Sequence, residues 1–230
     1  MCLALTACGS GATRPADTAA GTGGLAPDTA PVVRVGTETI TGALYDHWMS
    51  IGAATVEPPP ARAPLVYSPP SFDACVSALK ATAPRSRVTQ LRDRCRTIYE
   101  GINRRILNFL ITGYWLRDAA SQQHLTVTLP EVRTQFEKEK SANFNPATFR
   151  QLEQSSRQGV PDFLFAVETR MLSARLLARF TRAHPHRSEE ANIRVFNASL
   201  RRSWVPRTNC TRGYVVPDCK QYHPRPSSSS

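Results

Sequence analysis

The sequence predicts a mainly helical protein with a short β element near its N-terminus, and three observations support this fold class. Apolar residues recur every three or four positions along several segments after residue 41, as on the buried face of an α-helix. Residues 32–41 alternate instead, which is typical of a strand. The 18 prolines and 12 glycines gather mostly at the ends and in one internal run. We therefore expect one folded domain with tails.

The N-terminal part of this domain begins with the segment VVRVGTETIT, residues 32–41, which predicts a strand, a bend at Gly36 and a second strand end. Thr41 then precedes an amphipathic stretch, residues 43–52, and its hydroxyl is suited to cap that helix. Residues 56–72 are rich in proline and are expected to be extended. Tyr67 and Phe72 are expected to fix this segment to the surface of the domain.

Two helices are predicted next. Ser71 is expected to cap a short helix over residues 72–80, which ends before Pro84. A long helix follows over about residues 88–121, because apolar side chains recur there at helical spacing. Cys75 and Cys95 could then face each other in a helical hairpin.

The remaining elements are also helices. Thr128 is the expected cap of a helix that continues to residue 140, with Pro130 in its first turn. Periodicity predicts three further helices, over residues 145–155, 161–181 and 188–204. The residues after Cys219 end in a serine run and are expected to be disordered.

The charge of the chain is +11, from 29 basic and 18 acidic residues. Such a chain is attracted to nucleic acid, anionic lipid or acidic surfaces. The arginines are spread along the sequence, which favours solvated helix faces over a nucleic-acid site. An arginine-rich nucleic-acid binder remains an alternative, although it would act in the cytoplasm, against the cysteine pattern described below. The sequence contains no run of 18 apolar residues and therefore predicts no membrane-spanning helix.

The stretch Leu5-Thr6-Ala7-Cys8 resembles the lipobox of bacterial lipoproteins, in which the cysteine thiol carries a diacylglycerol. Residues 9–31 are rich in Gly, Ala, Thr and Pro, as expected of a tether. Only seven residues precede Cys8, fewer than a signal peptide requires, so residues 1–8 are interpreted as a truncated signal. The resemblance implies a lipid anchor at Cys8 on the outer face of the cell membrane. The alternative is a free cysteine in a tail.

Four further cysteines, Cys75, Cys95, Cys210 and Cys219, lack the CxxC spacing of zinc or redox sites. Two disulfides would suit an oxidising, extracytoplasmic compartment. The four residues permit three pairings, of which we favour the one between sequence neighbours. Four reduced, buried cysteines in a cytosolic protein are the alternative.

Candidate catalytic groups are few, and we predict no catalytic residue, no metal site and no cofactor. The five histidines form no HExxH motif, and no GxGxxG, GxSxG or phosphate-binding GxxxxGK[ST] motif occurs. His184-Pro185-His186 and the charged residues 137–140 are interpreted as solvated surface. Arg104 and Arg105, which could contact phosphate, are interpreted in the same way.

Three segments resemble the SurA and PrsA class of extracytoplasmic foldases. They are VVRVGTETIT, residues 106–140 and residues 158–177. The positions that match the family pattern are Leu110, Ile111, Trp115, Ala119, Val127, Thr128, Glu131, Val132, Gly159, Phe163 and Val167. The resemblance spans residues 32–205 and implies a helical chaperone domain with residues 56–72 inserted in it. Residues 206–230 would be a Cys-bracketed turn and a disordered tail, with no counterpart of the family's parvulin isomerase domain.

The resemblance implies a lipid-anchored chaperone that binds unfolded or nascent exported proteins and does not bind nucleic acid. Its candidate client-binding side chains are Trp48, Tyr67, Phe72, Tyr114 and Trp115. Ordinary core packing is the alternative for each of them. A diverged peptidyl-prolyl isomerase and a structural lipoprotein without clients are the alternative functions.

Overall fold

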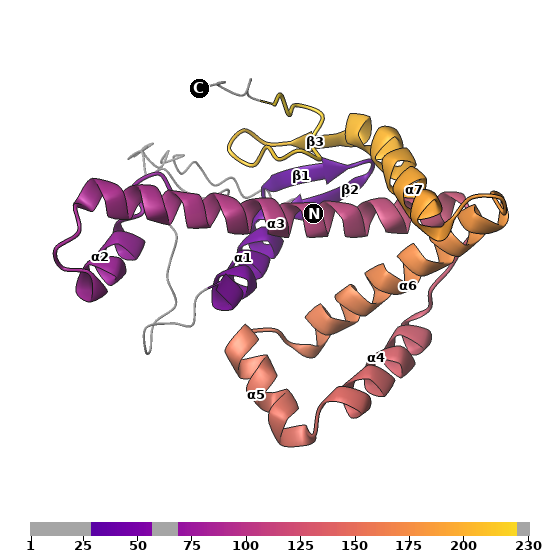
Figure 1. Cartoon of the computed structure of the whole chain (residues 1–230), viewed down its shortest axis with the longest axis horizontal. Coiled ribbons are helices and arrows are strands. Elements are labelled where there is room, and N and C mark those ends of the chain that lie inside the picture. The colour runs from indigo at the N-terminus through magenta and orange to yellow at the C-terminus, as the bar shows by residue number, and fades with distance from the viewer. Residues whose placement is uncertain (1–28, 57–68, 225–230) are drawn as a thin grey trace, which may run out of the picture.

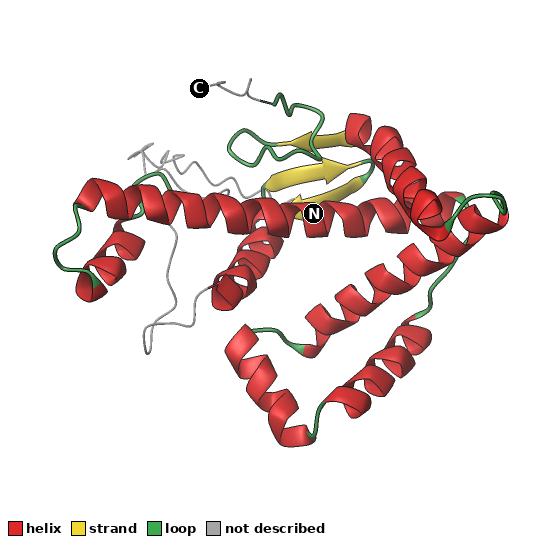
Figure 2. Cartoon of the chain, in the orientation of Figure 1, coloured by secondary structure: helices red, strands yellow, loops and turns green. Residues whose placement is uncertain are grey.

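The computed structural model describes residues 29–56 and 69–224. The described residues form seven α-helices, three short strands and one 3-10 turn. The longest helix, α3 (Val88–Gln122), crosses the molecule, and the sheet and the other helices are arranged along it (Figures 1 and 2). The predicted fold class, mainly helical with a β element near the N-terminus, is confirmed.

The sheet has the strand order β2-β1-β3 and is antiparallel throughout. β1 (Pro31–Val35) and β2 (Glu38–Thr41) form a hairpin, in which Val35 lies opposite Glu38. Gly36 has φ +57° in its turn, and a Cβ there would lie 3.0 Å from the Asp118 carboxylate. A larger residue at this position would therefore be strained in its backbone and would press on the Asp118 side chain.

The third strand, β3 (Thr208–Cys210), corrects the predicted boundary at residue 206. It pairs with β1, and Val33 lies opposite Cys210. Tyr214, Val216 and Cys219 are buried after it. The C-terminal segment up to this point is therefore part of the domain, because it completes the sheet and covers part of the core.

Two helices flank the N-terminal half of α3. α1 (Gly42–Val56) begins as predicted, with the Leu44 backbone N–H donating to Thr41 Oγ1 at 3.3 Å. α2 (Asp73–Thr82) does not begin as predicted, because its N-cap is Phe72, in the left-handed region at φ 57°, and not Ser71. The Ser71 carbonyl instead accepts a hydrogen bond from Arg92 of α3 at 3.1 Å.

The main core lies between α3, the sheet and the surrounding helices. Trp115 is its largest fully buried side chain, and its indole Nε1 donates to Thr208 Oγ1 at 2.8 Å. The Thr208 hydroxyl in turn donates to the Trp204 carbonyl oxygen at 2.8 Å. These two bonds connect α3 to β3 and to the end of α7 (Glu189–Trp204), just before the 3-10 turn η1 (Val205–Arg207).

Three helices form an arm beside this core: α4 (Leu129–Asn143), α5 (Pro146–Ser156) and α6 (Val160–Arg182) (Figure 1). The arm has its own small apolar cluster, formed by Val132, Phe136, Phe149 and Val167. α6 also packs on α3, where Gly113 gives room to Phe165. The arm is therefore joined to the main core mainly through α6.

The N-terminus of α4 is capped by Thr128, as predicted, and its hydrogen bonds make the stability of the protein depend on pH. Glu131 accepts hydrogen bonds from the Thr128 backbone N–H, from Arg175 and from the Thr128 hydroxyl, which lower the pKa of its carboxyl from 4.5 to about 2. The folded state therefore favours the ionised carboxylate, so this contribution is present above pH 4.5 and is lost as the pH falls towards 2.

We expect Glu131→Gln to be less stable than the wild type at pH 7 and the difference to shrink towards pH 2. Urea unfolding of both proteins at pH 7, 4 and 2 measures it. Glu137→Gln on the same helix is the control, because Glu137 is exposed and its ion pair within the described residues is with Lys140, three positions along the helix. A wild-type advantage that stays constant over this pH range would contradict the prediction.

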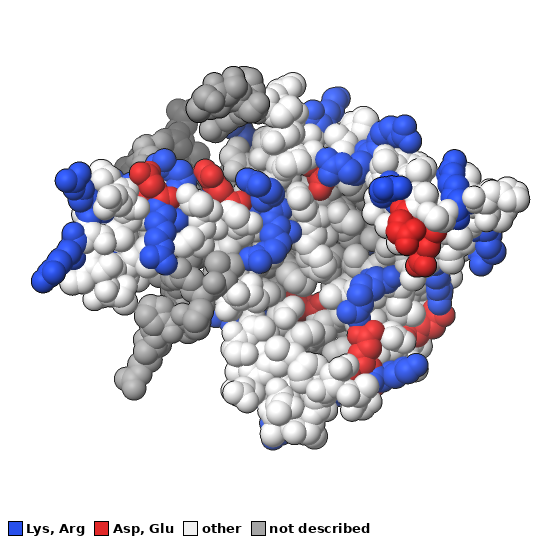
Figure 3. Space-filling view, viewed as in Figure 1, with Lys and Arg blue, Asp and Glu red and all other residues white. Residues whose placement is uncertain are grey.

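The surface shows positive and negative side chains interspersed. Lys and Arg are scattered over the face in Figure 3, and acidic side chains lie between them over α3 and the arm. Over the described residues, no helix is both long and apolar enough to cross a membrane.

Candidate functional site

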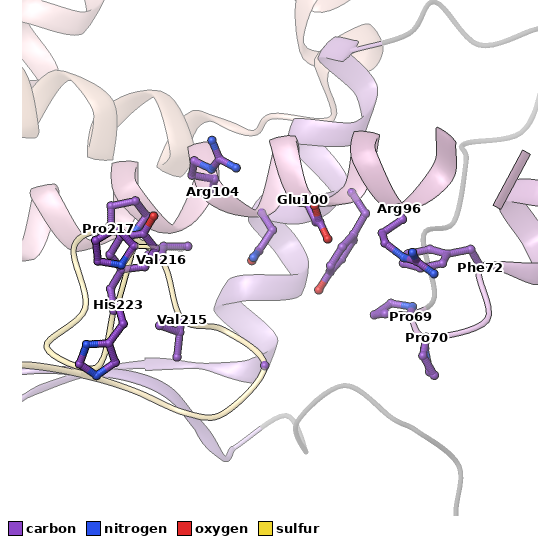
Figure 4. Close-up of a pocket in the computed structure, with 15 residues that line it drawn as sticks. Pro69, Pro70, Phe72, Arg96, Glu100, Arg104, Val215, Val216, Pro217 and His223 are labelled. Atoms are coloured by element: carbon purple, nitrogen blue, oxygen red, sulfur yellow. The ribbon is translucent and has the colours of Figure 1, made fainter. Parts of the chain in front are cut away.

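A groove of about 790 Å³ lies between α3, the loop after β3 and the segment that precedes α2. It is more than twice as large as two other hollows of the described residues, of about 310 and 270 Å³. Figure 4 shows Arg96, Glu100 and Arg104 along α3, with the C-terminal loop at one end and Phe72 with two prolines at the other. Three separate parts of the sequence therefore build one groove.

The α3 wall consists of residues on one helix face. Arg96, Tyr99, Glu100, Asn103 and Arg104 line the groove, and each is three or four positions from another member of the set. Residues three and four apart are neighbours on a helix surface, so this spacing brings them to one side. The long charged side chains are exposed, whereas Tyr99 and Asn103 are each only 9% exposed.

The second wall is the loop between Cys210 and Cys219, whose ends are joined by a disulfide. Two turns inside the loop are closed by backbone bonds from Tyr214 to Thr211 and from Cys219 to Val216. Tyr214 and Val216 are buried, and Val215 between them is 38% exposed and lines the groove. The turns and the disulfide thus present Val215 to the groove.

An ion pair between a buried carboxylate and an exposed arginine fixes the outer part of this loop. Asp218 is buried and pairs with Arg201 of α7, which also donates to the Pro217 carbonyl at 3.1 Å. Burial raises the pKa of the Asp218 carboxyl, and the Arg201 guanidinium lowers it in part. Pro217, which lines the groove, is therefore held through its own carbonyl and through its neighbour.

The third wall comes from Pro69, Pro70 and Phe72. The Pro69–Pro70 peptide bond is cis. Phe72 is almost fully buried, and its ring lies 5.8 Å from that of Tyr99, centroid to centroid. Its carbonyl accepts the Val76 N–H at 2.9 Å, so the start of α2 fixes this wall.

A chain of buried polar groups lies at the floor of the groove. The Tyr45 hydroxyl of α1 donates to Asn103 Oδ1 at 2.9 Å and lies 3.1 Å from the Tyr99 hydroxyl. Burial, and then the proximity of Tyr99, raise the pKa of Tyr45 far above its ordinary value. Burial also raises the pKa of Tyr99. Both phenols are therefore protonated and neutral at physiological pH.

The predicted client-binding aromatic residues need correction. Trp48, Phe72 and Trp115 are at most 5% exposed, because they pack in the main core, so they are not available as an exposed docking patch. Phe72 lines the groove with only 3% of its surface exposed. Tyr114 is partly exposed beside Arg117, whose guanidinium carbon lies 5.6 Å from the ring centroid, away from the groove. Tyr67 lies outside the described residues, as does Cys8.

The predicted cysteine pairing matches the structure, which joins Cys75 to Cys95 and Cys210 to Cys219. The groove residues Tyr99, Asn103 and Val215 were not singled out by sequence reasoning. Tyr99 and Asn103 do carry a signal, since they are polar residues set four apart within the apolar face of the long helix. Val215 carries none, because its exposure depends on how its loop folds.

His47 and His184 lie outside the groove and have hydrogen-bond partners within the fold. His47 Nε2 lies 2.7 Å from Asp162 Oδ1, and the Asp162 carboxylate also accepts the Gly159 N–H at the start of α6. His184 Nδ1 lies 2.8 Å from the Phe180 carbonyl oxygen. The described ranges contain no group of three or more His, Cys, Asp or Glu residues arranged to hold a metal ion.

Comparison with protein-family models finds no match, and neither curated proteins nor solved structures give one.

Proposed function

We propose that the protein is an extracytoplasmic chaperone that holds extended segments of unfolded exported proteins in the groove between α3 and the C-terminal loop. The observation that supports this proposal is the groove itself, of about 790 Å³, with apolar and charged side chains in its lining. The resemblance of residues 32–205 to the SurA and PrsA class suggested the same role.

The lining suits a weak binder of polypeptide. Val215 and Tyr222 are 38% and 39% exposed, and together with Pro69 and Pro217 they offer apolar surface. Contacts of this kind bind apolar side chains with modest affinity, and a holdase must also release its client.

The two disulfides support an oxidising compartment. Residues 5–8 match a lipobox, so we propose that Cys8 carries the lipid that anchors the chaperone at the outer face of the membrane. The net charge of +11 would add attraction to anionic lipid.

The groove is tested by placing a negative charge in it. We expect Val215→Asp to reduce the suppression of aggregation at least fivefold, because a carboxylate replaces apolar contact surface with a strongly hydrated group. Light scattering of chemically unfolded citrate synthase, diluted into buffer with the oxidised protein, measures the effect.

Val88→Asp is the matched control for this experiment. Val88 is 46% exposed, lies at the start of α3 outside the groove, and undergoes the same change of charge. Equal activity of the two variants, or no suppression by the wild type, would refute the proposal.

The anchor is tested separately, in a host that processes lipoproteins and with a complete lipoprotein signal sequence placed before residue 1. We expect Cys8→Ser to move the protein from the membrane fraction to the soluble fraction and to abolish incorporation of labelled fatty acid, because serine cannot form the thioether. Cys2→Ser is the control. Unchanged membrane association and labelling of Cys8→Ser would show that Cys8 is not the lipid attachment site.

A further inference from the structure

We propose that the groove recognises the main chain of its client through Asn103, and that the client segment is extended and carries carboxylates beside its apolar side chains. This inference rests on the proposed function and identifies the class of polypeptide that the groove binds. It follows from the hydrogen-bond arrangement at the floor of the groove and from the charges at its rim.

The hydrogen bonds at the floor fix the direction of the Asn103 amide. The Tyr45 hydroxyl has one proton, which it donates to Asn103 Oδ1 at 2.9 Å. The 3.1 Å bond between the two hydroxyls must then be donated by Tyr99 to Tyr45. Asn103 Oδ1 is thereby satisfied, which leaves the Nδ2 amino group as its free hydrogen-bonding group.

The Asn103 amino group has no hydrogen-bond partner among the described residues. The side chain lines the groove although the residue is 91% buried, since its exposed fraction is 9%. The described atoms that are buried without a hydrogen-bond partner do not include the Asn103 amino group, so this group is open to the groove and can donate to an acceptor that a ligand brings. The amide is held in place by a hydroxyl at the centre of the core, so it is oriented before any ligand arrives.

A main-chain carbonyl is the acceptor that best fits the proposed clients. Unfolded proteins differ in their side chains, but all of them present carbonyl and N–H groups along the chain. Tyr99, one helical turn from Asn103, also lines the groove, and after donating its proton to Tyr45 its hydroxyl can act only as an acceptor. A donor and an acceptor on one wall match the C=O and N–H groups along one edge of an extended segment.

The rim adds a preference for acidic segments. Arg104 is exposed and has no acidic partner within the described part of the chain, and Arg96 has only Asp93, at 3.4 Å. Glu100 is the one acidic side chain in the groove lining. Two arginines against one glutamate therefore favour a client carboxylate over a client ammonium group.

The experiment uses a dye-labelled octapeptide, Asp-Leu-Ser-Leu-Ser-Leu-Ser-Asp, and a series in which one amide at a time is replaced by an ester. The ester removes one N–H and weakens the neighbouring carbonyl as an acceptor. We expect fluorescence anisotropy with the wild-type protein to show a roughly tenfold rise in Kd at one or two positions of the series and little change at the others.

The key readout is the coupling with Asn103→Ala. This variant is expected to bind the parent peptide about tenfold more weakly and to show no further loss with the ester at the sensitive position. Tyr45→Phe, which removes the hydroxyl that orients the amide, is expected to shift affinity in the same direction. Asn108→Ala, an asparagine on the same helix outside the groove, is expected to bind as the wild type does.

The outcomes separate this inference from the proposed function. The proposed function holds if the parent peptide binds and Val215→Asp raises its Kd. The main-chain inference alone is then wrong if no ester changes the Kd, or if Asn103→Ala is as sensitive to the ester as the wild type. If neither the peptide nor unfolded citrate synthase binds, both fail. A peptide with lysines in place of its aspartates should bind several times more weakly, and equal binding would overturn the charge preference. Circular dichroism confirms that each variant is folded.

Discussion

Trp115→Ala is expected to lower the free energy of unfolding by about 4 kcal/mol, because it removes the largest fully buried side chain and leaves a cavity between α3, β3 and α7. The indole is 1% exposed, and it also loses its 2.8 Å hydrogen bond to Thr208. The Thr208 hydroxyl would keep its bond to the Trp204 carbonyl. Urea unfolding followed by circular dichroism measures the change.

Two variants separate the causes of this loss. Trp115→Phe fills most of the cavity but lacks the N–H, and we expect it to cost about 1–2 kcal/mol. Tyr222→Ala removes an aromatic ring that is 39% exposed, and we expect a change within about 0.5 kcal/mol. A Trp115→Ala variant as stable as Tyr222→Ala would mean that α3 does not pack on β3 as described.

Replacing Cys75 and Cys95 together by alanine is expected to lower the free energy of unfolding by about 3 kcal/mol, because the cross-link restricts an unfolded loop between residues 20 apart in sequence. Both cysteines are fully buried between α2 and α3, so their small alanine replacements fit the same space. Urea unfolding under non-reducing conditions measures the difference.

The matched control is the addition of a reductant. Dithiothreitol should destabilise the wild type more than the alanine variant, because only the wild type then loses the Cys75–Cys95 bond. The Cys210–Cys219 bond, with a separation of 9, is present in both proteins. Equal sensitivity of the two proteins to the reductant, together with equal stability without it, would show that Cys75 and Cys95 do not stabilise the fold.

The helices could be predicted because their signals are local. Thr128 with Glu131, Asn145 and Ser188 accept backbone N–H groups at the starts of α4, α5 and α7, and each is a residue type that caps helices through its own side chain. The apolar spacing from Val88 onwards likewise predicted α3 to within one residue at its end. These features depend on residues fewer than five apart.

The features that were missed depend on distant residues. β3 is a strand of three residues that exists because β1 offers it an edge, which no local pattern reveals. The N-cap of α2 is Phe72 and not Ser71, whose carbonyl accepts a hydrogen bond from Arg92 on another helix. The same limit applies to the groove, whose walls come from segments near residues 70, 100 and 215.

The aromatic candidates illustrate a second limit. The resemblance to the foldases implied that Trp48 and Trp115 bind apolar segments, but large aromatic side chains are also the most favourable to bury on folding. Both side chains are in the core. The aromatic ring that remains well exposed in the groove is Tyr222, which lies beyond the last predicted helix.

Because β3 pairs with β1, the sheet can be completed only once the C-terminal part of the chain is present. The Thr211 hydroxyl bonds to the Pro31 carbonyl across 180 residues of sequence. A ribosome or translocase that delivers the chain from its N-terminus would release the first hairpin long before its third strand arrives. Until then one edge of β1 is open to pairing with other chains, a hazard of unprotected strand edges. A chain built in this way would need protection of that edge until its C-terminal part has been synthesised.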